Sequence, residues 1–224
     1  MRSYTVAART SPLSRAQVDE VERELRRTYG AYALQRILVT SHGDLDRTRS
    51  LRDLPPSDFF TREVDRLVQE GLADFSVHSA KDLPPEPMEG ICVVGLTQGL
   101  DSRDAIVLRP GLAHLQPGAV IGTSSARRDQ AVRQLQSGIT IVDLRGTIEE
   151  RLARLSIDCD GVVIAECALQ RLGLGHLPRL FLSGPSACGQ GQLALCALET
   201  RNDVREFLEP IVYEAWLPAA EVML

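Results

Sequence analysis

Short apolar runs alternate along this chain with segments in which apolar residues recur every three or four positions. The first pattern is typical of buried strands and the second of helices with one buried face. In the first hundred residues the pattern predicts, in chain order, a helix opening at Ser11–Pro12, a strand over 35–40, a helix through Phe60–Val68 that Gly71 ends, and a strand over 74–77. Proline in a first helical turn and glycine after a last turn support these helix boundaries.

A second series of elements follows a stretch marked by proline and glycine at 109–118. The pattern predicts strands over 119–122, 139–144 and 161–165 and helices over 124–136 and 147–155, the last opened by a capping box of Thr147 and Glu150. Alternating strands and helices are typical of α/β architecture. We therefore predict two α/β domains, a discontinuous domain 1 formed by 1–98 and 192–224 and a domain 2 formed by 101–187, with a ligand cleft between them.

Composition narrows the function classes. The formal net charge of −5 argues against a surface made for nucleic acid, and the aromatic content of 4% offers no evident stacking platform for bases. No apolar run approaches the roughly 20 residues that span a bilayer, and the N-terminus has no signal-peptide pattern, so we expect a cytoplasmic protein with no membrane partner. The five cysteines include no CxxC pair, so we expect reduced thiols and no metal site.

Cationic and hydroxyl side chains, with one carboxylate among them, recur just before the first predicted helix and after three of the predicted strands. They are Arg9 and Ser11, then Ser79, Lys81 and Asp82, then Thr123, Ser124, Ser125, Arg127 and Arg128, and finally Arg145 and Arg151. Ligands bind at the carboxyl ends of strands in open α/β sheets, helix N-termini favour anions, and arginine grips carboxylates with two nitrogens. A serine before a helix is also a common N-cap, and an isolated arginine is commonly a solvated charge. The recurrence favours a site for a small polyanion.

Asp82 has two interpretations that the residues alone leave open. Beside Lys81 it could form an ion pair, or it could act in a cleft as a proton donor and a stabiliser of a cation. The pair Ser79 and Lys81 does not form the S-x-x-K nucleophile motif, because that motif needs its lysine at the position of Asp82. The chain also has no GxGxxG segment and no P-loop.

Several motifs together resemble the porphobilinogen deaminase (hydroxymethylbilane synthase) family in order and spacing. They are AARTSPLSRAQ near the start, VTSHGD (39–44), VHSAKDLP (77–84), SRDA (102–105), IGTSSARR (121–128), LRGT (144–147) and CGQGQLAL (188–195). The resemblance covers essentially the whole chain. It implies two domains like those of type II periplasmic binding proteins, a double crossover, and an active site between the domains. The implied reaction is stepwise deamination and head-to-tail condensation of four porphobilinogen molecules in tetrapyrrole (heme) biosynthesis.

The resemblance also implies roles for individual residues. Asp82 matches the catalytic aspartate, which assists loss of ammonia and stabilises the resulting pyrrolic cation. The positions that match holders of the acetate and propionate groups of a dipyrromethane cofactor and of the growing chain are Arg9, Ser11, Lys81, Ser125, Arg127, Arg128, Arg145 and Arg151. Ser79, Thr123, Ser124, Gly146 and Gln190 complete the predicted carboxylate-binding set, with Gln190 at the domain crossover. The expected partner is the small molecule porphobilinogen, bound by a monomer.

The chain departs from the family pattern at several points. The family has a third, α+β domain with a GGC-type cysteine that tethers dipyrromethane through a thioether. This chain ends at Leu224 without such a cysteine, so we expect that domain to be absent and no covalent attachment here. Cys188, in SACGQG, is interpreted as a small buried thiol. The family's GKGLF loop is replaced by 57–60 (SDFF), which removes a lysine and adds an acid, and LRGN has become LRGT.

Three functional hypotheses follow from these departures. The first is an active enzyme whose primer is held non-covalently or anchored differently. The second is a catalytically degenerate homologue that binds a pyrrole or another polycarboxylate, and the third is a truncated version of a full enzyme. Retention of Asp82 and of the arginines favours the first hypothesis, whereas loss of the cofactor cysteine favours the second.

Overall fold

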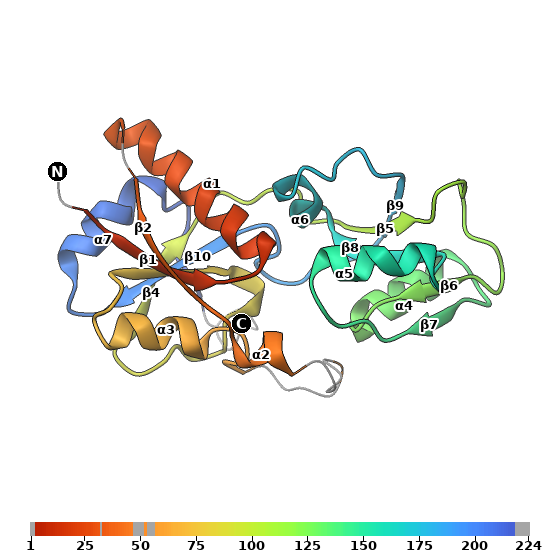
Figure 1. The fold of residues 1–224 in the computed structure, drawn as a ribbon, viewed down its shortest axis with the longest axis horizontal. Helices are drawn as coiled ribbons and strands as arrows, with labels where there is room; N and C mark the ends of the chain where they lie inside the picture. The colour runs from red at the N-terminus through yellow and green to blue at the C-terminus, as the bar shows by residue number, and fades with distance from the viewer. Residues whose placement is uncertain (1–2, 32, 47–51, 53–56, 218–224) are drawn as a thin grey trace. The chain divides into compact units, whose positions relative to one another are not determined.

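The structure is a computed structural model that describes residues 3–31, 33–46, 52 and 57–217 (Figure 1). The described residues divide into two compact units. Unit 1 takes its residues from Met1–Leu45, Pro56–Leu100 and Gln192–Leu224, and unit 2 takes its residues from Asp46–Pro55 and Asp101–Gly191. The chain thus passes into unit 2 after Leu100 and returns to unit 1 at Gln192.

Unit 1 is built on a mixed five-stranded sheet with the order β2-β1-β3-β10-β4. Its strands are β1 (Thr5–Arg9), β2 (Gln35–Val39), β3 (Phe75–Ser79), β4 (Ile91–Leu96) and β10 (Leu193–Leu198). β1 pairs in parallel with β2 and β3, whereas β10 runs antiparallel between β3 and β4. The helical segments are α1 (Pro12–Tyr29), α2 (His42–Leu45), α3 (Arg62–Gln69), η2 (Ala80–Asp82), α7 (Asn202–Leu208) and η4 (Glu209–Ile211).

The helices of unit 1 bury both faces of its sheet. On one face Val18, Val21 and Leu25 of α1 pack with Val6 of β1 and Phe207 of α7. The opposite face is covered by α3, where Val64 and Val68 pack against Ala7 and Cys196 (Figure 1). α1 follows β1, whose last residue is Arg9, and η2 follows β3, whose last residue is Ser79. The starts of α1 and η2 therefore lie at the carboxyl ends of two parallel strands.

Unit 2 repeats the plan with the strand order β7-β6-β8-β5-β9. Its strands are β5 (Asp104–Leu108), β6 (Val120–Gly122), β7 (Thr140–Val142), β8 (Gly161–Ala165) and β9 (Arg179–Phe181). β6 pairs in parallel with β7 and β8, and β5 runs antiparallel between β8 and β9. The helical segments are α4 (Ala126–Leu135), α5 (Ile148–Ala153), η3 (Arg154–Ser156) and α6 (Glu166–Arg171). Ile106, Ile121, Val132 and Val163 belong to one buried core.

The predicted α/β class and the elements named from the sequence are confirmed, with small shifts of their ends. The predicted helix over 124–136 is α4 with Ser125 as its N-cap, and the helix over 147–155 is α5 followed by η3. Five strands were not named from the sequence, namely β1, β4, β5, β9 and β10. Among the described helices, none combines the length and the apolarity that crossing a bilayer requires.

Gly161, at the start of β8, lies where two core side chains come close to the backbone. A Cβ at this position would lie 2.6 Å from Cγ2 of Ile106 and 2.8 Å from Cδ1 of Ile121, and both isoleucines are fully buried. We therefore expect Gly161→Ala to lower the free energy of unfolding by about 1–3 kcal/mol, measured by urea denaturation.

Gly175→Ala is the matched control for this prediction. A Cβ on Gly175 would have no heavy atom within 4 Å. The control is expected to leave the urea midpoint unchanged or slightly higher, since alanine restricts the unfolded chain more than glycine does. Equal midpoints for Gly161→Ala and the parent protein would contradict the packing of this core.

Candidate functional site

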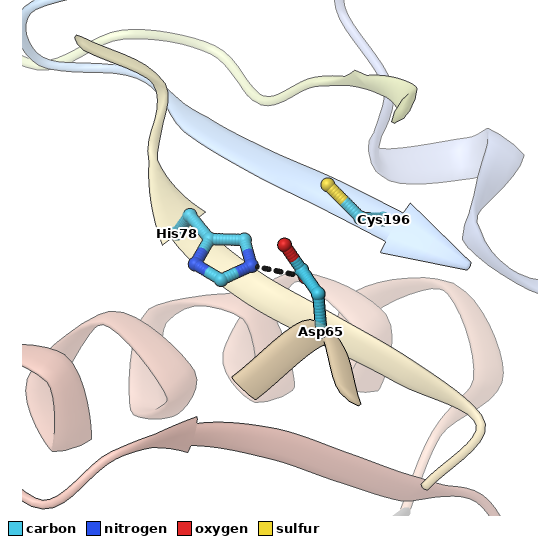
Figure 2. Close-up of side chains that lie close together, drawn as sticks. All are labelled: Asp65, His78 and Cys196. Carbon is cyan, nitrogen blue, oxygen red and sulfur yellow. Dashed lines mark hydrogen bonds and ion pairs between the residues drawn. The ribbon is translucent and has the colours of Figure 1, made fainter. Parts of the chain in front are cut away.

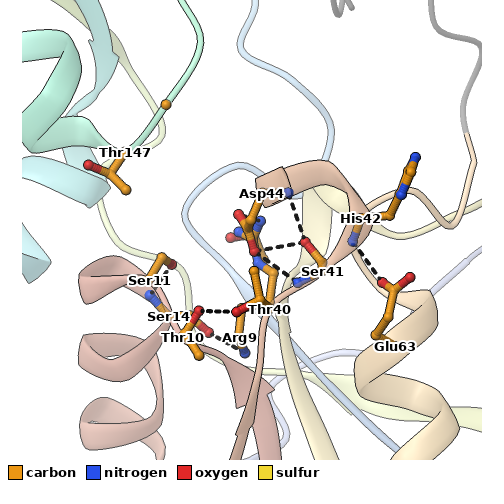
Figure 3. Close-up of polar contacts among 12 residues, drawn as sticks. Arg9, Thr10, Ser11, Ser14, Thr40, Ser41, His42, Asp44, Glu63 and Thr147 are labelled. Atoms are coloured by element: carbon orange, nitrogen blue, oxygen red, sulfur yellow. Dashed lines mark hydrogen bonds and ion pairs between the residues drawn. The ribbon is translucent and has the colours of Figure 1, made fainter. Parts of the chain in front are cut away.

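In unit 1, the end of β1 and the start of α1 carry Arg9 and Ser11. Ser11 is the N-cap of α1, because its hydroxyl accepts a hydrogen bond from the backbone N–H of Ser14 at 3.2 Å. The guanidinium of Arg9 pairs with Asp44 at 3.2 Å (Figure 3). The same guanidinium lies 5.0 Å from the ring centroid of Phe60. Asp44 belongs to the motif VTSHGD, for which no role was predicted. The structure shows that it orients Arg9.

The turn after β3 carries the second group, Ser79, Lys81 and Asp82. The Ser79 hydroxyl accepts a hydrogen bond from the amide of Gln17 at 2.7 Å, which ties this turn to α1. Lys81 is exposed and Asp82 is half-buried in η2. The Asp82 carboxylate makes no hydrogen bond or ion pair with any residue in the described part of the chain. It is therefore held by its backbone alone.

A buried polar cluster next to this turn contains Asp65 of α3, His78 of β3 and Cys196 of β10 (Figure 2). Ser76 of β3 is hydrogen-bonded to Asp65 and completes the network. Oδ1 of Asp65 accepts a hydrogen bond from the Ser76 hydroxyl at 2.7 Å and lies 2.7 Å from Nε2 of His78. Asp65 and His78 are 4% and 5% exposed, so the pair is cut off from water. The network joins α3 to β3 just before Ser79 and so fixes the strand from which η2 begins.

The same cluster has residue types that bind metals, with ligand atoms within 4.8 Å of one another. The contacts of these side chains fit a hydrogen-bonded network better than a metal site. The Asp65 oxygen already accepts two hydrogen bonds, and a metal would have to replace both. Burial raises the pKa of the Cys196 thiol well above its ordinary value, with the charge of Asp65 adding to the effect.

In unit 2, the loop from β6 into α4 carries three hydroxyls of the predicted set. Ser125 is the N-cap of α4 and accepts from the N–H of Arg128. The Ser124 hydroxyl donates to the carbonyl of Leu144, and the Thr123 hydroxyl accepts from the N–H of Ser125 at 3.3 Å. The Thr123 carbonyl accepts from Arg52 at 3.1 Å. These hydroxyl contacts hold the loop between β6 and α4 in place.

Arg127, Arg128 and Gln190 converge on one buried carboxylate, Asp104 at the start of β5. Arg127 Nη2 lies 2.5 Å from Oδ2, and Arg128 Nε and Nη2 lie 3.1 and 2.7 Å from Oδ1. Gln190 Nε2 donates to Oδ1 at 2.9 Å. Burial alone would raise the pKa of the Asp104 carboxyl, but the charge and hydrogen bonds of Arg128, with those of Arg127 and Gln190, outweigh burial and lower this pKa.

In unit 2, the segment from the end of β7 into α5 carries Arg145, Gly146 and Arg151. Arg145 Nη2 donates to the carbonyl of Asp46 at 3.0 Å, and Arg151 Nε donates to the carbonyl of Gly146 at 2.9 Å. Gly146 has φ of +102°, a left-handed conformation that favours glycine, and it precedes the capping box of Thr147 and Glu150. The predicted capping box is confirmed.

The interpretation of Cys188 as a buried thiol is wrong, because its side chain is exposed. Cys188 begins the turn 188–191 before β10, and Gly189 and Gly191 in this turn have φ of +67° and +102°. A surface turn leaves its first side chain in solvent. The other thiols are more buried, and burial, together with the charge of Asp158, raises the pKa of Cys159 to about 11.

Four polar partners of the candidate residues were not assigned a role from the sequence. They are Gln17, Asp44, Arg52 and Asp104. Asp104 stands in the quoted motif SRDA, but an aspartate that follows an arginine indicates a local ion pair as readily as a distant one. Asp104 begins the apolar run DAIVL, and this position predicts that its carboxylate is buried. A buried carboxylate needs cationic partners, so this was the feature of the sequence that could have indicated the arginines.

Comparisons with known proteins add to this geometry. The family model described as "Porphobilinogen deaminase, dipyromethane cofactor binding domain" matches residues 4–206. A porphobilinogen deaminase of Caldicellulosiruptor saccharolyticus is 36% identical over 200 residues, which cover 88% of this chain and 69% of the relative. That of Laribacter hongkongensis is 31% identical, covering 96% of this chain and 72% of the relative. That of Bordetella bronchiseptica is 36% identical, covering 92% and 68%.

Solved structures show the fold more distantly. The methionine binding protein MetQ superposes with a TM-score of 0.56 at 11% identity, covering 93% of this chain and 89% of that one. The sulfate-bound regulatory domain of OxyR2 from Vibrio vulnificus gives a TM-score of 0.55 at 10% identity, covering 94% and 95%. These likenesses show a fold of the type II periplasmic-binding-protein kind, and they show the fold alone. The match of the family model over most of the chain places this protein in the porphobilinogen deaminase family.

Proposed function

We propose that this protein is a hydroxymethylbilane synthase, which releases ammonia from porphobilinogen and joins the pyrroles head to tail for tetrapyrrole biosynthesis. Membership of the porphobilinogen deaminase family supports the reaction class. The observation that carries the proposal is the state of Asp82. Its carboxylate is half-buried on η2 and has no hydrogen-bonding partner among the described residues, so both oxygens are available to a substrate.

Asp82 has two tasks in this proposal. When the carbon–nitrogen bond of the protonated aminomethyl group breaks, the electron pair leaves with ammonia and positive charge develops on the pyrrole. A fixed carboxylate stabilises that charge without having to reorganise. The new carbon–carbon bond joins the methylene carbon of this cation to the free ring carbon of the other pyrrole. That ring carbon must then lose its proton, and the same carboxylate can accept it.

The arginines hold the carboxylates of the substrate and of a dipyrromethane primer. Bidentate guanidinium groups and the free N–H groups at the starts of α1 and α4 match the acetate and propionate groups that each pyrrole carries. In unit 2, Arg127, Arg128 and Arg145 would hold these groups. Dipyrromethane, when bound, supplies the free pyrrole carbon to which the first substrate is joined. We propose that the arginines of this chain hold the primer through its carboxylates.

Asp82→Asn tests the catalytic role. The amide keeps the size of the side chain but removes the negative charge and the ability to accept a proton, so we expect the rate of hydroxymethylbilane formation to fall by about 10²–10⁴-fold. A single-turnover assay with porphobilinogen and added dipyrromethane measures this rate. Asp158→Asn, which changes an exposed acid paired with Arg154, is the control and should keep the parent rate.

The outcomes separate the enzyme from a binding module. A parent protein that binds porphobilinogen but forms no product would identify a binding module. In that case Asp82→Asn would bind the substrate equally well or better, because a repelling carboxylate has been removed. Robust product formation by Asp82→Asn would overturn the assignment of Asp82.

Arg127→Ala and Arg145→Ala test the carboxylate-binding role. Each variant removes a charge-assisted hydrogen-bond donor, and we expect each to weaken porphobilinogen or dipyrromethane binding by about 1.5–3 kcal/mol, measured by calorimetry. Arg133→Ala on α4 is the matched control, because Arg133 is paired with Asp129 and is 55% exposed. Unchanged affinity in both test variants would exclude these arginines from the site.

Intact-mass spectrometry tests how the primer is retained. Purified protein, with or without incubation with dipyrromethane, is expected to have the mass of the chain alone under denaturing conditions, since the proposed contacts are ionic. An added dipyrromethane mass would refute non-covalent retention. Because Cys188 is exposed, peptide mapping of any such adduct would begin with that thiol.

A further inference from the structure

Asp104 is buried, with 3% of its surface exposed, yet it lies among residues that the proposed function assigns to ligand binding. Its two oxygens accept four hydrogen bonds, one from Arg127, two from Arg128 and one from Gln190. Arg128 is 11% exposed and Arg127 is 33% exposed. These hydrogen bonds fix the orientation of both guanidinium planes and the positions of their positive charges.

The two guanidiniums keep donors that Asp104 does not use. Arg128 gives Nε and Nη2 to Asp104, and its Nη1 donates to no residue that the structure describes. Arg127 gives Nη2 to Asp104 and Nη1 to the carbonyl of Pro185, while its Nε has no acceptor in the described ranges. Each side chain is therefore clamped along one edge and retains N–H groups elsewhere.

A second buried pair in the same unit shows what a saturated arginine looks like. Glu166 is 2% exposed and accepts from Nε and Nη2 of Arg179, both at 2.7 Å. The remaining nitrogen, Nη1, donates to the carbonyls of Gly175 and Leu177 at 2.6 and 3.0 Å. All three nitrogens of Arg179 therefore donate to acceptors within the protein. Arg127 and Arg128 each keep one nitrogen that has no acceptor among the described residues.

We infer that Asp104 is a positioning residue that holds Arg127 and Arg128 in the orientation that selects ligands with two spaced carboxylates over simple anions. The inference rests on the proposed function, because the ligand class comes from it. An arginine side chain loses rotamer entropy when it is fixed, and the contacts with Asp104 impose that loss before the ligand binds. The negative charge of Asp104 also offsets part of the positive charge of Arg127 and Arg128. An anion whose oxygens do not match the positions of the remaining N–H donors therefore gains less binding free energy.

The test compares Asp104→Asn with Glu166→Gln, which weakens the saturated pair in the same way. Calorimetry would measure the affinities of the full chain for porphobilinogen and for inorganic phosphate. We expect Asp104→Asn to bind porphobilinogen about tenfold or more weakly, while its phosphate affinity stays unchanged or rises. Glu166→Gln should keep the parent ratio of the two affinities, even though both variants unfold at lower urea concentrations than the parent protein.

Asp104→Glu keeps the test decisive if the asparagine variant does not fold. It preserves the charge of the buried pair but displaces the carboxylate by one methylene, so the ratio of porphobilinogen to phosphate affinity should fall without loss of folding. An unchanged ratio in the folded Asp104 variants, or an equal fall in Glu166→Gln, would overturn the inference. A parent protein that binds no porphobilinogen would overturn the proposed function and the inference together, and that result appears before any variant is made.

Discussion

A carboxylate that is removed from water has to be paired inside the protein, and this requirement organises unit 2. Asp104 opens β5, and its partners come from α4 and from the turn that precedes β10. The buried charge therefore fixes where α4 lies against the sheet and how the chain runs just before it leaves the unit. Removing one partner of such a pair costs roughly 3–5 kcal/mol, so the placement of these arginines is coupled to the stability of the fold.

Unit 1 meets the same requirement with different residues. Asp65 of α3 accepts hydrogen bonds from Ser76 and His78 of β3, at the centre of the sheet. A strand held in this way gives a fixed starting point for η2, which carries Asp82. In each unit a buried acid thus stands behind the residues that the family relationship singles out, and it acts on the geometry of the site through its hydrogen bonds.

The internal contacts of the arginines would let an acidic protein present cations to the anionic ligand proposed for it. The formal net charge is −5, yet Arg9, Arg127 and Arg128 each lie against an acid that orients them. Arg145 and Arg151 are oriented by backbone carbonyls. Side chains that are already ordered lose little further entropy when a ligand binds, so their remaining donors act at full strength.

Local interactions determined what could be predicted from the sequence by itself. The proline and serine that open α1, the apolar face of that helix and the capping box of α5 depend on residues a few positions apart. The motifs also pointed to the family. Strands β5 and β10 were not named from the sequence, although they are apolar runs buried on both faces, as is β8, which was named; periodicity alone does not separate such a run from a buried helical segment.

Only the tertiary structure decided which acids the candidate arginines contact. Asp104 is 23 and 24 positions from Arg127 and Arg128 and 86 positions from Gln190, and these residues meet only when β5 joins the sheet. The sequence also did not determine the exposure of Cys188, because a small apolar residue occurs both in cores and in surface turns. Periodicity records which face of an element is buried, whereas the pairing of charges depends on how the elements pack.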